Sequence, residues 1–356
     1  MASVDVTIMG AGIFGLSVAW ACLNKGARVR VIDPNGVGTM ASGGLVGALA
    51  PHVPERWNDK HQFQFESLIM AQTYWQEIET ISGLPSGYGR LGRLQPINND
   101  RGLALARGRV EGAKSLWQGK AEWDVVAAAD FGDWAPASPT GWLVRDTLSA
   151  RIHPQFAVKA LASVIMAKGG EIVGTGQVEG TVVWATGVAG LEELSAAFGH
   201  DMGGGEKGQG ALLQYEARDL PQLFSNFVHV VPHFDGTVAV GSTSERYYDD
   251  PDSTDILLDE VIEKAIAGVP VLKDAPVIAR WAGARPRSFT RAPVLGVHPL
   301  KKGQFIANGG FKIGFGVAPK VGQVMADLIL ESVDAIPDKF RAVFLGAPTG
   351  ASGGDI

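Results

Sequence analysis

The first 33 residues contain two short, mainly apolar runs, separated by a segment whose apolar residues recur at helical spacing. Residues 4–8 and 28–32 are compact runs rich in β-branched side chains, which is typical of strands buried on both faces. Between them, Leu16, Ala19 and Leu23 recur at the spacing of one helix face. The pattern therefore predicts a strand, a helix ending near Gly26, and a second strand.

The turn between the first strand and the helix carries three glycines at a defined spacing. Gly10 permits a tight turn, Gly12 lets the backbone approach a pyrophosphate, and Gly15 lets helix and strand pack closely. The helix N-terminus would present free N–H groups to phosphate, and Asp33 would accept hydrogen bonds from a ribose. A glycine-rich turn alone is common, but with these flanking elements the segment predicts nucleotide binding.

Further along the chain, periodicity predicts elements that fall into two groups. We expect an amphipathic helix over 62–82, a mixed Trp-rich stretch to about 140, and a helix over 154–168. A strand begins at 171–173 and a short apolar strand covers 181–187. A hairpin turns at Asp235 and Gly236, and further β-rich segments centre on 281–286 and cover 305–310. A helix containing Val321, Val324 and Leu328 closes the fold.

These elements predict an α/β protein with two domains. One is a discontinuous Rossmann-like domain built from residues 1–60, 141–205 and 300–346. The other is an α+β substrate domain with a large mixed or antiparallel sheet, built from 61–140 and 206–299. Residues 347–356 are expected to form a flexible tail.

A loop of small residues follows the predicted second strand at positions 41–52. Such residues let backbone run close to a flat ligand, although a plain flexible loop would have the same composition.

Composition and charge narrow the class of protein. The chain has 356 residues, 46% hydrophobic and 19% charged, with a formal net charge of −6. This fits a globular enzyme and argues against nucleic acid or an anionic membrane as the main partner. The single cysteine, Cys22, cannot form an internal disulfide. We expect neither a leader nor an apolar run long enough to cross a bilayer. A cytoplasmic location is expected.

Six segments, in order, resemble the D-amino acid oxidase superfamily of FAD enzymes, nearest to its glycine oxidase and sarcosine oxidase branch. They are residues 10–15, 41–52, 182–187, 230–243, 281–296 and 307–319. The first is a sharp motif, and the order of the six carries the resemblance.

The resemblance implies FAD, held non-covalently because Cys22 is misplaced for a flavin tether. The implied cofactor-binding residues are Gly10, Gly12, Ile13, Phe14, Gly15, Asp33, Ala41, Ser42, Val46, Gly47, Ala48, Val178, Gly187, Gly310, Phe311, Lys312, Ile313, Gly314, Phe315 and Gly316. A nicotinamide enzyme is the alternative that the glycine turn alone leaves open.

The resemblance also implies a substrate site at Arg285, whose planar guanidinium would bind a carboxylate bidentately. A structural ion pair is the alternative role. The glycine oxidases carry a second arginine where this chain has Lys312, and a tyrosine where it has His229, which puts glycine itself in doubt as the substrate. His229 could donate a hydrogen bond or titrate near neutral pH, or it could be a strand histidine whose hydrogen bonds are satisfied within the protein. His52 could reach the pocket.

The implied reaction is oxidative deamination of a D-amino acid or a glycine-like substrate by hydride transfer from Cα to flavin N5. It would give an imino acid and then a 2-oxo acid, with no general base. Oxygen would yield hydrogen peroxide, whereas a quinone or an electron-transfer partner would make the enzyme a dehydrogenase. Alternatives are a secondary-amine enzyme for sarcosine or proline, a flavoprotein that modifies tRNA, and a non-catalytic flavoprotein.

Two further expectations concern partners. Arg90, Arg93, Arg287 and Arg291 lie in plausible places, and any that face the pocket would favour a substrate with a second anionic group. A homo-oligomer is possible for such an enzyme, although no interface signature is present.

Overall fold

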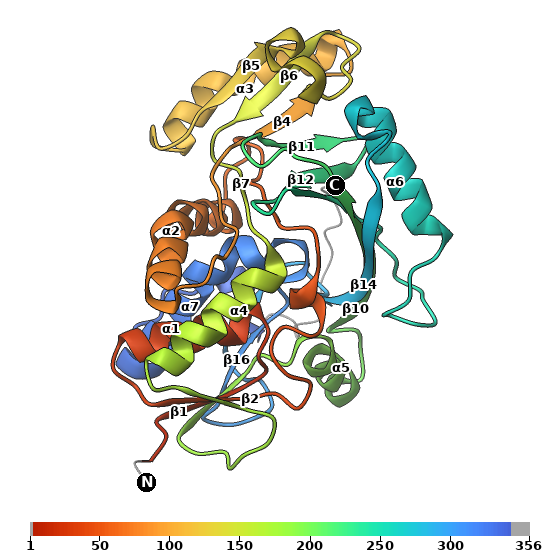
Figure 1. Cartoon of the computed structure of the whole chain (residues 1–356). Coiled ribbons are helices and arrows are strands. Elements are labelled where there is room, and N and C mark those ends of the chain that lie inside the picture. The colour runs from red at the N-terminus through yellow and green to blue at the C-terminus, as the bar shows by residue number, and fades with distance from the viewer. Residues whose placement is uncertain (1–2, 343–356) are drawn as a thin grey trace.

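The computed structural model describes residues 3–342 and contains two large sheets, joined by crossing segments of chain (Figure 1). The predicted tail at 347–356 lies outside the described residues. The helices are α1 (Ile13–Asn24), α2 (Asp59–Ser82), α3 (Asp100–Leu116), α4 (Pro154–Ala167), α5 (Gly187–Phe198), α6 (Ile256–Gly268) and α7 (Gly314–Glu331). Short 3₁₀ turns lie at Ala41–Gly43, Ala128–Trp134, Pro270–Leu272, Phe311–Ile313 and Asp338–Phe340.

A six-stranded sheet forms the lower half of Figure 1, and its order is β15-β16-β9-β1-β2-β8. Its strands are β1 (Val6–Met9), β2 (Val29–Ile32), β8 (Glu171–Val173), β9 (Thr181–Trp184), β15 (Val294–Val297) and β16 (Phe305–Asn308). All neighbouring pairs are parallel except β15 and β16. The predicted strand–helix–strand unit is present as β1, α1 and β2, and its apolar residues are buried because helices cover the sheet.

Helices α1, α4 and α7 pack together over the six-stranded sheet, and α2 lies against α4 and α7 (Figure 1). Helix α7 with its preceding turn, Phe311–Glu331, is long and apolar enough to cross a membrane by length and composition, which corrects the expectation that no apolar run has this length. Half of its apolar 18-residue window is buried. Its contacts with α1 and α2 account for the apolar face in the way expected of a core helix.

An eight-stranded sheet forms the upper half, in the order β14-β10-β13-β12-β11-β4-β6-β5. Its neighbours are antiparallel except for β4 and β11. Its strands are β4 (Arg93–Pro96), β5 (Trp123–Ala127), β6 (Trp142–Asp146), β10 (Gly203–Gln214), β11 (Gln222–Ser225), β12 (Val228–Pro232), β13 (Thr237–Gly241) and β14 (Val277–Ser288). A two-stranded sheet, β3 (Ala48–Leu49) with β7 (Ala150–Arg151), lies between the halves.

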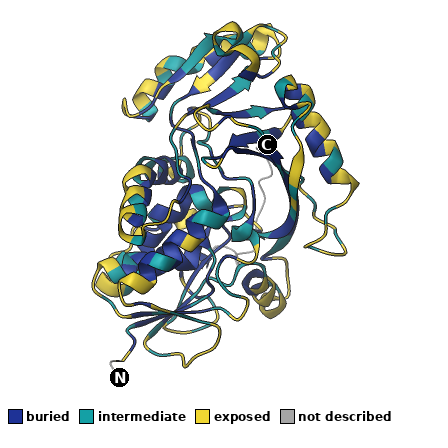
Figure 2. Ribbon diagram, viewed as in Figure 1, coloured by how far each residue is buried: buried dark blue, intermediate teal, exposed yellow. Residues whose placement is uncertain are grey.

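The predicted hairpin is present as β12 and β13, with Gly236 at φ 83° in its turn. Helix α6 covers β10, β12 and β13, and its buried face joins the core of the large sheet. The outward faces of α3, α5 and α6 are exposed, whereas most central strands are buried (Figure 2).

Two strands and one helix pack against a different domain from the one that the predicted boundaries give them. Strand β6 belongs to the large sheet although residues 141–205 were assigned to the nucleotide domain. Strand β15 pairs with β16 in the six-stranded sheet, and α2 packs on α4 and α7, although both were assigned to the substrate domain. A local apolar pattern identifies a strand or a helix but does not specify which distant partner will cover it. The division into domains therefore stays a proposal.

Candidate functional site

The turn between β1 and α1 is shaped by contacts that only glycine permits. Gly10 adopts φ 113°, and a Cβ there would overlap the carbonyl oxygen of Ala185. A Cβ at Gly15 would overlap the carbonyl oxygen of Gly10. The backbone thus forms a cradle at the N-terminus of α1, whose N-cap residue, Gly12, has no side chain to cap the first N–H groups.

Two polar side chains complete this cradle. Asp33, after β2, accepts a hydrogen bond from Ala11 N at 2.8 Å. Ser42 Oγ accepts from Ile13 N at 3.0 Å, and a Cβ at Gly12 would lie 3.2 Å from the same hydroxyl. A carboxylate that can accept from ribose hydroxyls, placed after the second strand beside a glycine turn that can receive a pyrophosphate, is the arrangement typical of an adenine dinucleotide site.

The small-residue loop runs from the cradle toward the large sheet. A Cβ at Gly47 would overlap the carbonyl oxygen of Ile152, so the loop approaches the start of α4 as closely as backbone allows. A Cβ at Gly241 would lie 2.7 Å from a methyl of Val46, and one at Gly44 would lie 3.4 Å from the ring of Trp281. The loop, including Ala41 and Ala48, therefore reaches the face formed by β10, β13 and β14.

The turn from Gly310 to Gly316, near the C-terminal end of the chain, lies against the start of α1. A Cβ at Gly310 would lie 3.0 Å from the Phe14 ring, and one at Gly314 would lie 3.7 Å from a methyl of Ile13. After the 3₁₀ turn Phe311–Ile313, helix α7 begins at Gly314 and continues through Phe315 and Gly316. Asn308 donates to Gly187 O at 2.8 Å, which ties the start of α5 to this turn.

Most of the predicted cofactor residues thus form one connected surface, and this backbone cradle fits FAD. Val178 is half-exposed in the connection between β8 and β9. Its neighbour Gln177 accepts a hydrogen bond from Arg30 of β2 at 2.9 Å. Val178 therefore follows the edge strand β8, whose neighbour β2 leads to Asp33. Its role beside an adenine stays a prediction.

Arg285 projects from β14, with its guanidinium largely inside the protein. It donates to Ser242 Oγ at 3.0 Å and to Thr243 O at 2.6 Å. A Cβ at Gly208 would overlap the guanidinium, so a glycine in the paired strand β10 makes room for it. Burial lowers the pKa of Arg285, while Glu206 and Glu245 act to raise it, and the group stays charged at neutral pH.

Arg285 and Lys312 both lie near the ring of Phe311. The guanidinium carbon lies 6.0 Å from the centre of the Phe311 ring, and Lys312 Nζ lies 5.3 Å from the same centre. Lys312 also donates to Ser244 Oγ at 2.8 Å. Burial lowers the pKa of Lys312, and repulsion from Arg285 lowers it further. The structure therefore brings together the two predicted substrate cations beside the turn at 310–316.

Sequence reasoning missed Glu206, which is buried on β10 opposite Arg285 in the strand register. Its carboxylate accepts a hydrogen bond from Ser244, and it lies 3.2 Å from Arg287 Nε and 3.8 Å from Lys312 Nζ. The sequence signal that could have identified Glu206 is an acidic residue within a glycine-rich strand. Its partners become neighbours only through the pairing of β10 with β14 and the approach of the 310–316 turn.

His229 lies on β12 and packs its ring against Phe224, with ring centres 4.7 Å apart. Its Nδ1 is buried without a hydrogen-bond partner among the described residues. Burial, with the nearby charges of Arg93 and Lys312, lowers its pKa to about 3. The expectation that it titrates near neutral pH is therefore corrected, because the ring remains uncharged there.

His52 lies apart from these cations. Its backbone N–H donates to Gln64 Oε1 at 3.0 Å, and its ring contacts the same oxygen. The His52 and His61 rings lie with their centres 4.4 Å apart, tilted by 34°. Burial lowers the pKa of His52 to about 4. Among residues 3–342 it makes no recorded contact with Arg285 or Lys312, so its place in the substrate site stays a prediction.

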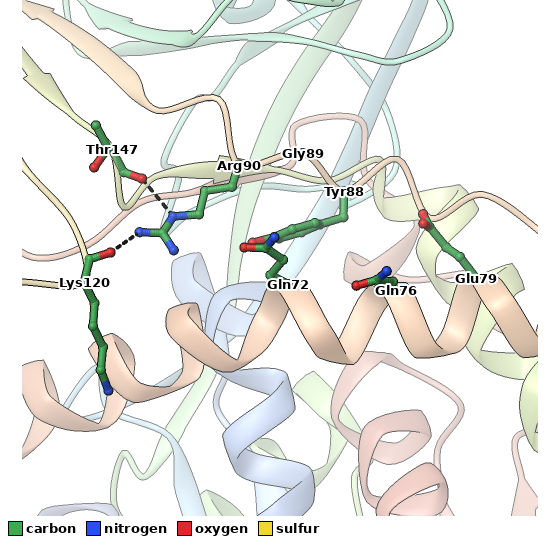
Figure 3. Close-up of a pocket in the computed structure, with 8 residues that line it drawn as sticks. All are labelled: Gln72, Gln76, Glu79, Tyr88, Gly89, Arg90, Lys120 and Thr147. Carbon is green, nitrogen blue, oxygen red and sulfur yellow. Dashed lines mark hydrogen bonds between the residues drawn. The ribbon is translucent and has the colours of Figure 1, made fainter.

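Arg90 and Arg93 have structural partners. Arg93 forms a buried ion pair with Asp146, with Nε and Oδ2 3.0 Å apart. Arg90 donates to the carbonyl oxygens of Thr147 at 2.8 Å and Lys120 at 2.7 Å. Figure 3 shows these bonds in a hollow between α2 and the segments that flank β4 and β6, where Tyr88 and Gln72 also lie. Apart from Arg90 itself, none of the predicted substrate or cofactor residues lines this hollow.

Comparison with known proteins gives the family. The family described as "DAO: FAD dependent oxidoreductase" matches residues 5–328. The glycine oxidase of Bacillus licheniformis is 25% identical over 360 residues, covering 92% of this chain and 93% of that protein. The bifunctional protein ThiO/ThiG of a Nostoc species is 26% identical over 92% of this chain, and the chain spans about half (53%) of that relative's length.

Solved structures share the fold. The glycine oxidase of Geobacillus kaustophilus superposes with a TM-score of 0.82 at 19% identity, covering 98% of this chain and 99% of that one. The iminodiacetate oxidase of Chelativorans sp. BNC1 also gives a TM-score of 0.82, at 22% identity, covering 95% and 98%. The match along most of the chain selects FAD over a nicotinamide cofactor, and this chain belongs to the DAO family of FAD-dependent oxidoreductases.

Proposed function

We propose that this protein oxidises the C–N bond of an amino acid or of an N-alkylated amino acid. One observation carries the proposal: the Arg285 guanidinium lies, largely buried, where the small-residue loop and the 310–316 turn meet the large sheet. A buried cation beside a flavin cradle is suited to hold a substrate carboxylate and so to orient Cα. The relatives named glycine oxidase agree with this chemistry.

The roles of the residues follow from their positions. The cradle of Gly10, Gly12 and Gly15 with Asp33 would hold the adenosine and pyrophosphate, and the loop at 41–48 with the 310–316 turn would hold the flavin. FAD, when bound, supplies the acceptor for the two electrons of the Cα–H bond. Arg285 would bind and orient the carboxylate, and the N-terminus of α7 would stabilise negative charge at the flavin edge.

No side chain is assigned as a general base. His229 is neutral because burial lowers its pKa to about 3, but it is packed against Phe224. Lys312 donates a hydrogen bond to Ser244 and faces the Glu206 carboxylate. The protein would therefore act by binding and orientation, with the amine entering in its neutral form.

The test is an anaerobic titration of the purified holoenzyme with primary and N-methyl amino acids, followed by visible absorbance. Bleaching of the flavin bands by one class supports the proposal. Ammonia as the product indicates a primary amine, whereas methylamine or a cyclic imine indicates the secondary-amine alternative. If no amine bleaches the flavin, the chain is a flavoprotein without this activity.

The electron acceptor, the cellular location and the oligomeric state are also open to test. Readmitting air to reduced enzyme separates an oxidase, which regains colour and releases peroxide, from a dehydrogenase that needs a quinone or a protein partner. The single cysteine and the acidic charge balance support a cytoplasmic enzyme that acts on small molecules. Sedimentation of the holoenzyme would give its oligomeric state.

A further inference from the structure

An excess of positive charge surrounds the candidate substrate site. Arg285, Arg287 and Lys312 surround the carboxylate of Glu206, which lies within ion-pair distance of Arg287 and Lys312 and opposite Arg285 on the neighbouring strand. Glu245 is a second carboxylate that acts on Arg285, with a smaller effect than Glu206. Arg246 and Arg291 form no ion pair among residues 3–342, and both lower the pKa of Arg287 by repulsion, after the larger effect of burial. Repulsion from Arg291 also contributes to the lowered pKa of Lys312.

Two of these cations also have unused hydrogen-bond donors. Arg285 and Arg287 are two residues apart on β14, so their side chains leave the same face of the sheet. The Nε–H of each is buried and has no hydrogen-bond partner within the described part of the chain. Buried donors without acceptors cost free energy, so both positions favour a ligand that supplies acceptor oxygens.

Glu206 does not itself satisfy these donors. One of its oxygens is occupied by Ser244 and Lys312, and the other faces Arg287 Nε in a geometry that forms no hydrogen bond. Since its oxygens already face three partners, Glu206 is poorly placed to bind a substrate ammonium. The remaining charge of the cluster is positive.

We infer that the substrate carries two carboxylates: Arg285 binds the one next to the reacting carbon, and Arg287 with Lys312 binds the second. The class comprises acidic amino acids and N-carboxymethyl amino acids. Lys312 is half-exposed and Arg287 is mostly buried, so the second carboxylate would lie on the solvent side of the first. This inference rests on the proposed function for the identity of the reacting bond.

Matched substrates test the inference. D-aspartate is compared with D-asparagine, and iminodiacetate with sarcosine, since each pair differs mainly in the second carboxylate. The dissociation constant from anaerobic flavin bleaching should be about tenfold lower, or more, for the dianion, because a charge-assisted contact has that effect. Equal or tighter binding of both neutral partners would overturn the inference while leaving amine oxidation intact.

A binding measurement that needs no turnover separates the two proposals. Malonate and acetate are titrated into the oxidised holoenzyme by calorimetry and by the perturbation of its flavin absorbance. Malonate should bind more tightly, and its advantage should shrink as salt is raised. This result would support the anion site even if no amine reduced the flavin, and equal binding of the two anions would count against it.

Variants that remove a positive or a negative charge from the cluster should change dianion binding in opposite directions. Lys312→Met should remove most of the preference for malonate, whereas Lys264→Met, which breaks an exposed ion pair with Glu260 on α6, should not change it. Glu206→Gln removes the competing negative charge and should tighten dianion binding. Weaker dianion binding in Glu206→Gln, in a variant whose flavin spectrum is retained, would instead assign Glu206 to a substrate cation.

Discussion

The two sides of the candidate site are built by different means. The cofactor side consists of backbone held in place by glycines, as at Gly10 and Gly47, where any side chain would overlap a carbonyl oxygen. The substrate side consists of charged side chains, including Arg285, Glu206 and Lys312, drawn from strands and a turn far apart in the sequence. We therefore propose that steric shape fixes the cofactor, whereas the balance of charge selects the substrate.

The largest expected effect comes from filling the cradle. Gly10→Val should abolish flavin binding and lower the free energy of unfolding by about 3 kcal/mol, because it adds a clash with Ala185 and strains a backbone at φ 113°. Flavin content by absorbance and denaturant unfolding measure the two effects.

Gly108→Ala is the matched control. Gly108 lies inside α3 with open space around it, so alanine should stabilise the protein by about 0.5–1 kcal/mol and leave flavin content unchanged. A flavin-replete Gly10→Val variant would contradict the steric account of the cofactor side.

The next effect concerns the charge on the substrate side. Arg285→Met should raise the dissociation constant of the substrate about 10- to 100-fold and leave flavin bound, because a charge-assisted contact is lost without touching the cradle. Anaerobic titration measures it.

Arg280→Met provides the comparison on the same strand, since Arg280 is half-exposed and pairs with Asp259 of α6. Its substrate affinity should match that of the unaltered protein. If both variants bind substrate equally, Arg285 has the structural role that the sequence left open.

A third test uses the neutral histidines of the interior. Burial lowers the pKa values of His229 to about 3 and of His52 and His233 to about 4, against about 6.5 in an unfolded chain. Between pH 6.5 and 4 the unfolded chain therefore binds protons that the folded chain excludes, and the free energy of unfolding falls as the pH falls.

His229→Gln should flatten this slope by up to about 1.4 kcal/mol per pH unit, which is the contribution of one ring. Denaturant titrations at several pH values measure the slope. An unchanged slope would mean that the ring titrates alike in both states, and that the substrate side is more hydrated than the packing of His229 on Phe224 indicates.

The smallest effect is expected at Cys22. This thiol is buried within α1, and burial raises its pKa to about 12, so it offers no thiolate for a covalent bond to flavin. Acid precipitation should release all the flavin into the supernatant, and Cys22→Ala should retain the flavin content of the unaltered protein. Flavin remaining in the pellet would contradict non-covalent binding.

The sequence by itself determined the parts of the protein whose physical causes are local. The first strand–helix–strand unit, the turn at Asp235 and Gly236, and the helix beginning at Pro154 each depend on residues a few positions apart. The resemblance added the order of the remaining cofactor segments, and the structure brings most of them to one surface.

Only the tertiary structure decided the contents of the substrate side. The antiparallel pairing of β10 with β14 places Glu206 opposite Arg285, and the return of the chain at Gly310 adds Lys312. It also determined that the His229 Nδ1 is buried, that the pKa of this ring is lowered, and that β15 joins the six-stranded sheet. Periodicity shows that a face will be buried, but the charges that meet there depend on long-range register, which no local pattern encodes.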